Sequence, residues 1–199
     1  MKLLRRAAHL SARFVSSLVP RQVSATDRVW VASILEPAEF ELWLRMSRAD
    51  AAESVGVARR IERSLRAHSR FDSNTDRPRH SDSTIRLNDV CAAALVHDVG
   101  KLDSGLAPFG RAVATVGGAL AGHGIAAAWS SSRGFTRRAG LYLRHHELGA
   151  DRIGLIGGRR CASDWARVHH DSSRWPTIDF SWEVCVALAH ADGENVPAR

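Results

Sequence analysis

One apolar segment that ends in two potential metal ligands constrains this chain more than any other feature. Residues 88–99, NDVCAAALVHDV, are almost continuously apolar and predict a short buried helix, with Asn88 or Asp89 as its N-cap and Gly100 as its stop. His97 and Asp98 lie at the end of this helix. Neighbouring helical side chains point about 100° apart, so both reach one ion only if it lies beyond the helix end. The segment therefore predicts a metal or active site at that end.

A histidine next to an aspartate also has a simpler interpretation, namely a hydrogen-bonded core histidine beside a capping carboxylate. This chain adds a third group at the same place, because Lys101 follows Asp98 by three residues. The only other lysine is Lys2, so the position of Lys101 is unusual for this composition. The three residues together favour a functional site.

Further potential ligands follow at three places in the chain. They are His145 and His146 in YLRHHELGAD, His169 and His170 in WARVHHDSSRW, and Asp192 in ALAHAD. Imidazole and carboxylate ligands together suit manganese, iron or zinc, and the lack of paired cysteines argues against a structural zinc site. Taken alone, a histidine pair on a helix is more often a surface feature than a metal site. The histidines for which we expect no metal role are His9, His68, His80, His123 and His190.

Helical periodicity covers most of the chain and predicts an all-α fold. We expect helices within residues 37–67, with a break and a cap at 47–50, and within residues 114–129, 136–156, 162–170 and 181–192. Residues 68–84 are polar, lack an apolar period and predict a surface loop. Strand patterns are sparse. A chain of 199 residues suits one domain, which we place at residues 26–199.

Residues 1–25 form a basic N-terminal arm in this interpretation. Apolar residues recur there at three- and four-residue steps and predict a short amphipathic helix: Leu3, Ala7, Leu10, Phe14 and Leu18. Such a helix either packs on the domain or docks on a membrane surface or a partner. Both alternatives stay open at this stage.

The composition narrows the environment and the partners. The net charge of +7 comes almost wholly from arginine, and a basic surface attracts nucleic acid, phosphorylated ligands or anionic lipid. The arginines are scattered among few aromatic residues, so we do not expect a nucleic-acid partner. Cys91, Cys161 and Cys185 form no CxxC pair, and no apolar run reaches the roughly 18 residues of a membrane-spanning helix. These features favour a cytoplasmic protein.

The order of the motifs resembles that of the HD-domain metal-dependent phosphohydrolases. VHDVGKLDSGL, RHHELGA, WARVHH and ALAHAD occur in the family's order, and residues 13–50 look like the start of small actinobacterial HD-domain proteins. The resemblance implies an HD-domain helical bundle. His97 and Asp98 match the pair that names the family, Asp192 matches its last metal-ligating aspartate, and Lys101 matches a lysine placed to meet phosphate.

The resemblance implies one or two metals. His145 and His169 match extra histidines of two-metal versions, such as the HD-GYP relatives that cleave cyclic dinucleotides. The glycine-tyrosine-proline signature of those relatives is absent after His170. Glu53, in AAESVGVARRI, stands where the family has its first histidine ligand. A carboxylate still binds hard or borderline metals.

The implied activity is metal-dependent hydrolysis of a phosphate ester of a nucleotide or a related small molecule. The divalent ion would be manganese, iron, zinc or magnesium, and the catalytic residues would be Asp98 and Lys101. The implied ligands are Glu53, His97, Asp98, His145, His169 and Asp192. The alternative is a catalytically weakened HD domain that serves as a regulatory or ligand-binding module.

Overall fold

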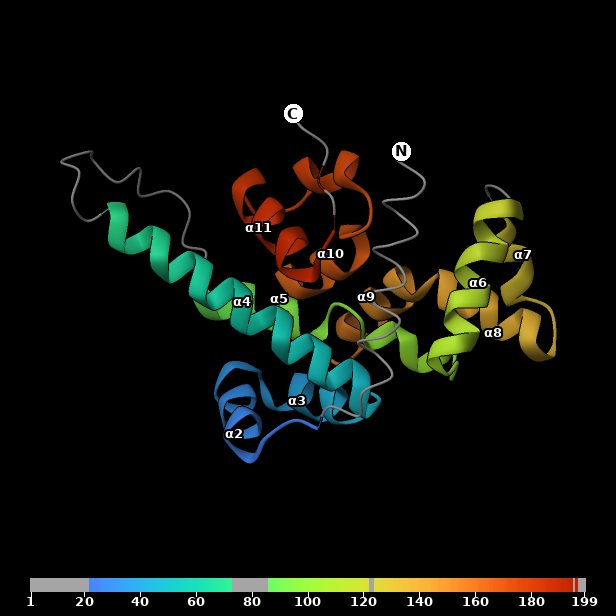
Figure 1. The fold of residues 1–199 in the computed structure, drawn as a ribbon, viewed down its shortest axis with the longest axis horizontal. Coiled ribbons are helices and arrows are strands. Elements are labelled where there is room, and N and C mark those ends of the chain that lie inside the picture. The colour runs from blue at the N-terminus through green and yellow to red at the C-terminus, as the bar shows by residue number, and fades with distance from the viewer. Residues whose placement is uncertain (1–21, 73–85, 122–123, 195, 197–199) are drawn as a thin grey trace.

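The computed structural model describes residues 22–72, 86–121, 124–194 and 196, and all regular structure in these ranges is helical (Figure 1). The all-α prediction is therefore confirmed. The predicted arm helix at residues 3–18 lies outside the described residues. The elements are α2 (Ala25–Ile34), α3 (Pro37–Leu44), α4 (Arg48–Asp72), α5 (Leu87–Val96), the 3-10 helix η1 (Val99–Asp103), α6 (Pro108–Ala121), α7 (Ile125–Ser130), α8 (Gly134–Leu143), α9 (His145–Leu155), α10 (Arg160–Val168), the 3-10 helix η2 (Ser172–Thr177) and α11 (Trp182–Asp192).

Helix α5 lies at the centre of the main core. Residues 90–96 are all buried, and α5 packs against α4 and α10, with α2, α3 and α11 also in contact (Figure 1). A helix that is apolar on every side can be enclosed in this way. The predicted caps were wrong, because the N-cap is Arg86 and both Asn88 and Asp89 lie in the first turn.

Helix α4 begins at the cap that the sequence predicts. Ser47 Oγ accepts a hydrogen bond of 3.1 Å from the backbone N–H of Asp50. The helix then continues to Asp72, past His68, where we expected a loop to begin. No glycine or proline interrupts residues 61–72, so nothing in the local sequence stops the helix there. The rest of the predicted loop, residues 73–84, lies outside the described ranges.

Helices α6, α7 and α8 form a separate lobe, which we call the α6–α8 lobe (residues 108–143). Its small core consists of Ala114 and Ala139 together with Leu106, which precedes α6. The lobe lies at the right-hand end of the molecule in Figure 1. The predicted helix over residues 114–129 is two helices here. Gly124, with φ at +84°, precedes α7 in a left-handed conformation that favours glycine.

Candidate metal centre

Three buried histidines come together where helices end. His97 follows the last residue of α5, His169 follows the last residue of α10, and His145 opens α9 directly after the break from α8. All three side chains are buried. The site is therefore built from chain segments far apart in sequence, at points where the backbone leaves a helix.

The three imidazole rings are oriented by the same device. In each, Nδ1 donates a hydrogen bond to the backbone carbonyl three residues earlier: His97 to Ala94 at 2.9 Å, His145 to Tyr142 at 2.7 Å, and His169 to Ala166 at 2.8 Å. These carbonyls lie in the last turn of a helix, where backbone acceptors lack partners within the helix. Because Nδ1 carries the proton, Nε2 of each neutral ring presents a lone pair. A lone pair on Nε2 is the form in which histidine binds a metal.

The potential ligand atoms form two groups that share one histidine. The first is His97, Asp98 and His169, the second is His145, His169 and His170, and within each group the ligand atoms lie within 4.8 Å of one another. Asp192 adjoins the first group, since its Oδ1 lies 3.8 Å from Nε2 of His97. The structure thus brings together five of the six predicted ligands.

Several atoms that face this site lack a hydrogen-bond partner. Nε2 of His97, Nε2 of His169 and Oδ1 of Asp98 are buried and unpartnered within the described part of the chain. Buried polar atoms are nearly always paired, and each exception calls for an explanation. A bound cation would satisfy all three.

The contact between His145 and His170 also fits a cation. Their Nε2 atoms lie 3.1 Å apart, and Nδ1 of His170 lies 2.5 Å from a carboxylate oxygen of Glu194. The carboxylate can only accept, so Nδ1 of His170 holds a proton, as Nδ1 of His145 does. Two lone pairs then face each other and repel unless a proton or a metal ion lies between them.

Asp98 connects the two groups. Its Oδ2 lies 3.5 Å from Nε2 of His97 and contacts the Lys101 ammonium, while its Oδ1 lies 3.3 Å from Nε2 of His145. The single free lone pair of His169 can bind one ion only. A carboxylate has two oxygens, so Asp98 is the residue that could bridge two ions.

The protonation states at this site suit metal binding. Burial lowers the pKa of His145 to about 4, even though Asp98 opposes the shift, and burial also lowers the pKa of His169 well below its ordinary value. Burial would raise the pKa of Asp98, but Lys101, His97 and His145 hold that pKa well below the usual range. At neutral pH the imidazoles of His145 and His169 are therefore neutral and the carboxylate of Asp98 is charged, which are the forms that coordinate metals.

Lys101 is held as a cation beside the site. Burial disfavours its charged form, but Asp98, Tyr142 and Asp50 raise the pKa of Lys101 above its ordinary value. Arg111 pairs with Asp50 through its two terminal guanidinium nitrogens, and the bond from Nη2 measures 2.7 Å. Lys101 is thus the cation that contacts Asp98, while Arg111 is paired with Asp50.

Gly100 sets the distance between η1 and α9. It does not end α5, as we predicted, because α5 ends at Val96 and Gly100 lies within η1. A Cβ at this position would lie 1.9 Å from the carbonyl oxygen of His145 and 2.5 Å from the backbone nitrogen of Gly149. Only a glycine lets η1 approach α9 closely enough to place Asp98 beside His145.

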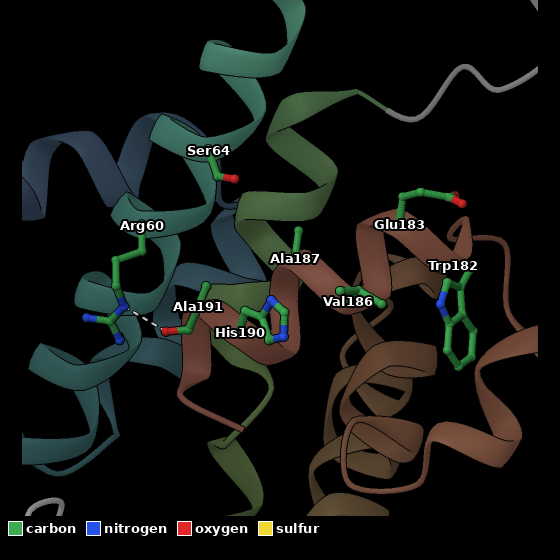
Figure 2. Close-up of a pocket in the computed structure, with 8 residues that line it drawn as sticks. All are labelled: Arg60, Ser64, Trp182, Glu183, Val186, Ala187, His190 and Ala191. Carbon is green, nitrogen blue, oxygen red and sulfur yellow. Dashed lines mark hydrogen bonds between the residues drawn. The ribbon is translucent and has the colours of Figure 1, made fainter. Parts of the chain in front are cut away.

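The structure does not bring Glu53 into either group of ligands. Its carboxylate lies 3.3 Å from a guanidinium nitrogen of Arg60, and 42% of its side chain is exposed. Arg60 in turn donates a hydrogen bond of 2.6 Å to the carbonyl of Ala191, the residue before Asp192 (Figure 2). Val57, one turn after Glu53 on the same side of α4, lines a small cavity together with His97, His169 and Asp192. Glu53 therefore lies beside the site, and a salt bridge holds it.

Figure 2 shows a second pocket, an open one between α4 and α11. Its lining residues are Arg60, Ser64, Trp182, Glu183, Val186, Ala187, His190 and Ala191. None of them belongs to the two ligand groups, so this pocket is separate from the candidate metal centre.

His170 is the ligand that we did not select from the sequence. The sequence shows the His169–His170 pair, but the family resemblance implies only His169 as a ligand. Helix α10 ends at Val168, so both histidines follow the helix and can face the same site. For His97 and Asp98 we reasoned that two neighbouring residues can reach one ion beyond a helix end. The same reasoning applied to His169 and His170 would have identified His170.

Comparisons with known proteins add no relative. Neither the known protein families nor the curated proteins nor the solved structures include a significant match to this chain. Among the described residues, no helix is long and apolar enough to cross a membrane.

Proposed function

We propose that this protein is an HD-domain metal-dependent phosphohydrolase that cleaves a phosphate ester of a nucleotide or a related small molecule. The observation that carries the proposal is a buried cluster of potential ligands in which Nε2 of His97, Nε2 of His169 and Oδ1 of Asp98 have no hydrogen-bond partner among the described residues. The order of the motifs around His97 and Asp98 supports the assignment to this family, and the donor set supports a divalent transition metal.

The residues present fit one or two ions. His97, Asp98, His169 and Asp192 would hold the first ion, and His145 and His170 would hold a second together with Asp98. Nitrogen and oxygen donors in this mixture suit manganese, iron or zinc. A bound divalent ion supplies Lewis-acid chemistry, which polarises a phosphoryl oxygen and acidifies water.

The chain's own residues supply charge and orientation. Lys101 is protonated and adjoins Asp98, so its ammonium can neutralise charge on a phosphoryl oxygen. Asp98 holds Lys101 on one oxygen and presents the other toward His145. It is therefore placed both to ligate and to orient a nucleophile. The carbonyls of Ala94, Tyr142 and Ala166 keep the three imidazoles in the metal-binding tautomer.

Elemental analysis of untagged protein, followed by hydrolysis assays, tests the proposal. We expect bound transition metal in the purified protein and turnover of a generic phosphomonoester or phosphodiester, such as a p-nitrophenyl phosphate, that a chelator abolishes and one added metal restores. The double variant His97→Ala, His169→Ala should bind no metal at the first group. Equal and negligible metal content in wild type and variant, after incubation with manganese, iron or zinc, would contradict the proposal.

A second candidate function is a metal-binding HD domain with little turnover, acting as a regulatory or ligand-binding module. The observation that favours it is the salt bridge between Glu53 and Arg60. This bridge occupies the residue that stands in place of the family's first histidine. Metal binding without hydrolysis of any phosphorylated metabolite would support this candidate over the first.

Substitution of Glu53 tests its part in the site. If the carboxylate exchanges Arg60 for the metal, Glu53→Ala should lower metal affinity, and Glu53→His should tighten binding of zinc or iron and raise turnover. Both changes should exceed the roughly 10–100-fold that residues behind the ligands typically contribute. Isothermal titration calorimetry with the metal measures the changes in affinity, and a phosphoesterase assay measures the change in turnover.

Glu41, which is exposed on α3, provides the matched control. Glu41→Ala should leave metal affinity unchanged. If both Glu53 variants behave like this control, Glu53 serves only to pair with Arg60.

A further inference from the structure

The outward face of α6 carries large apolar side chains. Phe109, Val113, Val116 and Leu120 are 72%, 42%, 57% and 84% exposed. Their spacing of four, three and four residues places them in one row along the helix. Phe135 of α8, which is 50% exposed, adjoins Gly110 at the start of this row.

The inward face of the same helix carries small residues instead. Ala114 is buried, and a Cβ on Gly118 would lie 2.7 Å from a methyl group of Leu143. A helix of a globular protein normally turns its large apolar residues toward the core. Here that order is inverted. An exposed apolar row of this kind marks a surface that another apolar phase covers.

The charge on this part of the chain has one sign. Residues 104–146 contain no aspartate or glutamate but five arginines. Three of them are engaged within the fold: Arg111 with Asp50, Arg138 with the carbonyls of Ser104 and Gly105, and Arg144 with Glu147. Arg133, the N-cap of α8, and Arg137 within α8 are exposed and form no ion pair with a described residue. The lobe therefore carries both an exposed apolar row and exposed cations.

We propose that the α6–α8 lobe docks on the surface of an anionic lipid bilayer. The apolar row of α6 and Phe135 enter the boundary between headgroups and acyl chains, and Arg133 and Arg137 meet the lipid phosphates. An apolar face together with arginines in the same unit is the combination that interfacial helices use. A second copy of the chain would bring two lobes without carboxylates together, and like charges would oppose that contact. The proposal does not depend on the hydrolase activity.

Vesicle flotation with the full chain tests this docking. Wild type should float with vesicles of equal parts phosphatidylcholine and phosphatidylglycerol and remain unbound with phosphatidylcholine alone. The variant Phe109→Ser, Leu120→Ser should bind the mixed vesicles about 100-fold more weakly, because each exposed apolar side chain contributes roughly tenfold when it enters lipid. Arg133→Glu, Arg137→Glu should weaken binding in a salt-dependent manner.

The matched control is the variant Val29→Ser, Leu155→Ser, which removes two apolar side chains of 72% and 86% exposure outside the lobe. It should bind like wild type, and circular dichroism should show all variants folded. No binding by wild type, or equal binding by the lobe variant, would overturn the proposal; the latter would assign lipid contact to another segment. Sedimentation without lipid supplies a further test. If wild type sediments as a dimer and the variant Phe109→Ser, Leu120→Ser as a monomer, the apolar row is an interface between two copies of the chain. That result would also overturn the proposal.

Discussion

Asp98→Asn should lower metal affinity by more than about 100-fold and abolish any hydrolase activity. Asp98 contacts potential ligands of both groups, with Oδ2 at 3.5 Å from Nε2 of His97 and Oδ1 at 3.3 Å from Nε2 of His145. Residues behind the ligands already alter affinity by roughly 10–100-fold, so loss of a central ligand charge should cost more. Isothermal titration with manganese and zinc measures the change.

The same substitution also removes the partner of Lys101, and this second effect has to be separated from the first. Both side chains are mostly buried, at 9% and 15% exposure. Breaking a buried ion pair from one side costs about 3–5 kcal/mol of stability. The variant Asp98→Asn, Lys101→Met removes both charges and should recover much of that stability, as measured by urea unfolding, without recovering metal.

Asp103 provides the matched control within η1. Its carboxylate pairs with Arg152, and it belongs to neither ligand group. Asp103→Asn should therefore keep metal affinity within about twofold of wild type, since it leaves the ligands and their supporting bonds in place. Retention of metal by folded Asp98→Asn at wild-type affinity would remove Asp98 from the centre of the site.

The part of the site that the sequence predicts is the set of histidines that lie at helix ends. His97, His145 and His169 each follow or open a helix, and the apolar run before His97 made its burial predictable. The hydrogen bonds from Nδ1 to a carbonyl three residues earlier are local consequences of those ends. Local features of this kind can be inferred from one sequence, because a residue and its partner lie in the same turn.

Other features depend on how distant segments pack, which the sequence pattern does not specify. The hydrogen bond from Arg60 to the carbonyl of Ala191 requires the position of α11, although Glu53 and Arg60 share one face of α4. Which face of α6 points inward depends on α8, because Leu143 of α8 packs against Gly118 on that face. Periodicity locates an apolar row, but it does not determine which side of the helix meets the core.

Gly100→Ala should lower the free energy of unfolding by about 3 kcal/mol or more and weaken metal binding as well. The added Cβ would lie 1.9 Å from the carbonyl oxygen of His145 and 2.5 Å from the nitrogen of Gly149, and both of these are backbone atoms. A side chain could rotate away, but backbone cannot, so η1 and α9 would have to separate. Overpacking of a tight core typically costs about 1–3 kcal/mol, and a clash with backbone belongs at or above the upper end.

The separation of η1 from α9 has a second consequence at the site. Asp98 precedes η1 and His145 opens α9, so their 3.3 Å contact would lengthen and the second ligand group would lose its connection to the first. Gly154→Ala, in the same helix α9, is the control, because a Cβ there meets nothing within 4 Å. Alanine in place of a helical glycine should raise stability by about 0.5–1 kcal/mol. In urea unfolding, the free energy of unfolding should therefore fall in Gly100→Ala and rise in Gly154→Ala. In metal titration, the affinity should fall only in Gly100→Ala. Equal stability of both variants would mean that η1 does not approach α9 as closely as the structure indicates.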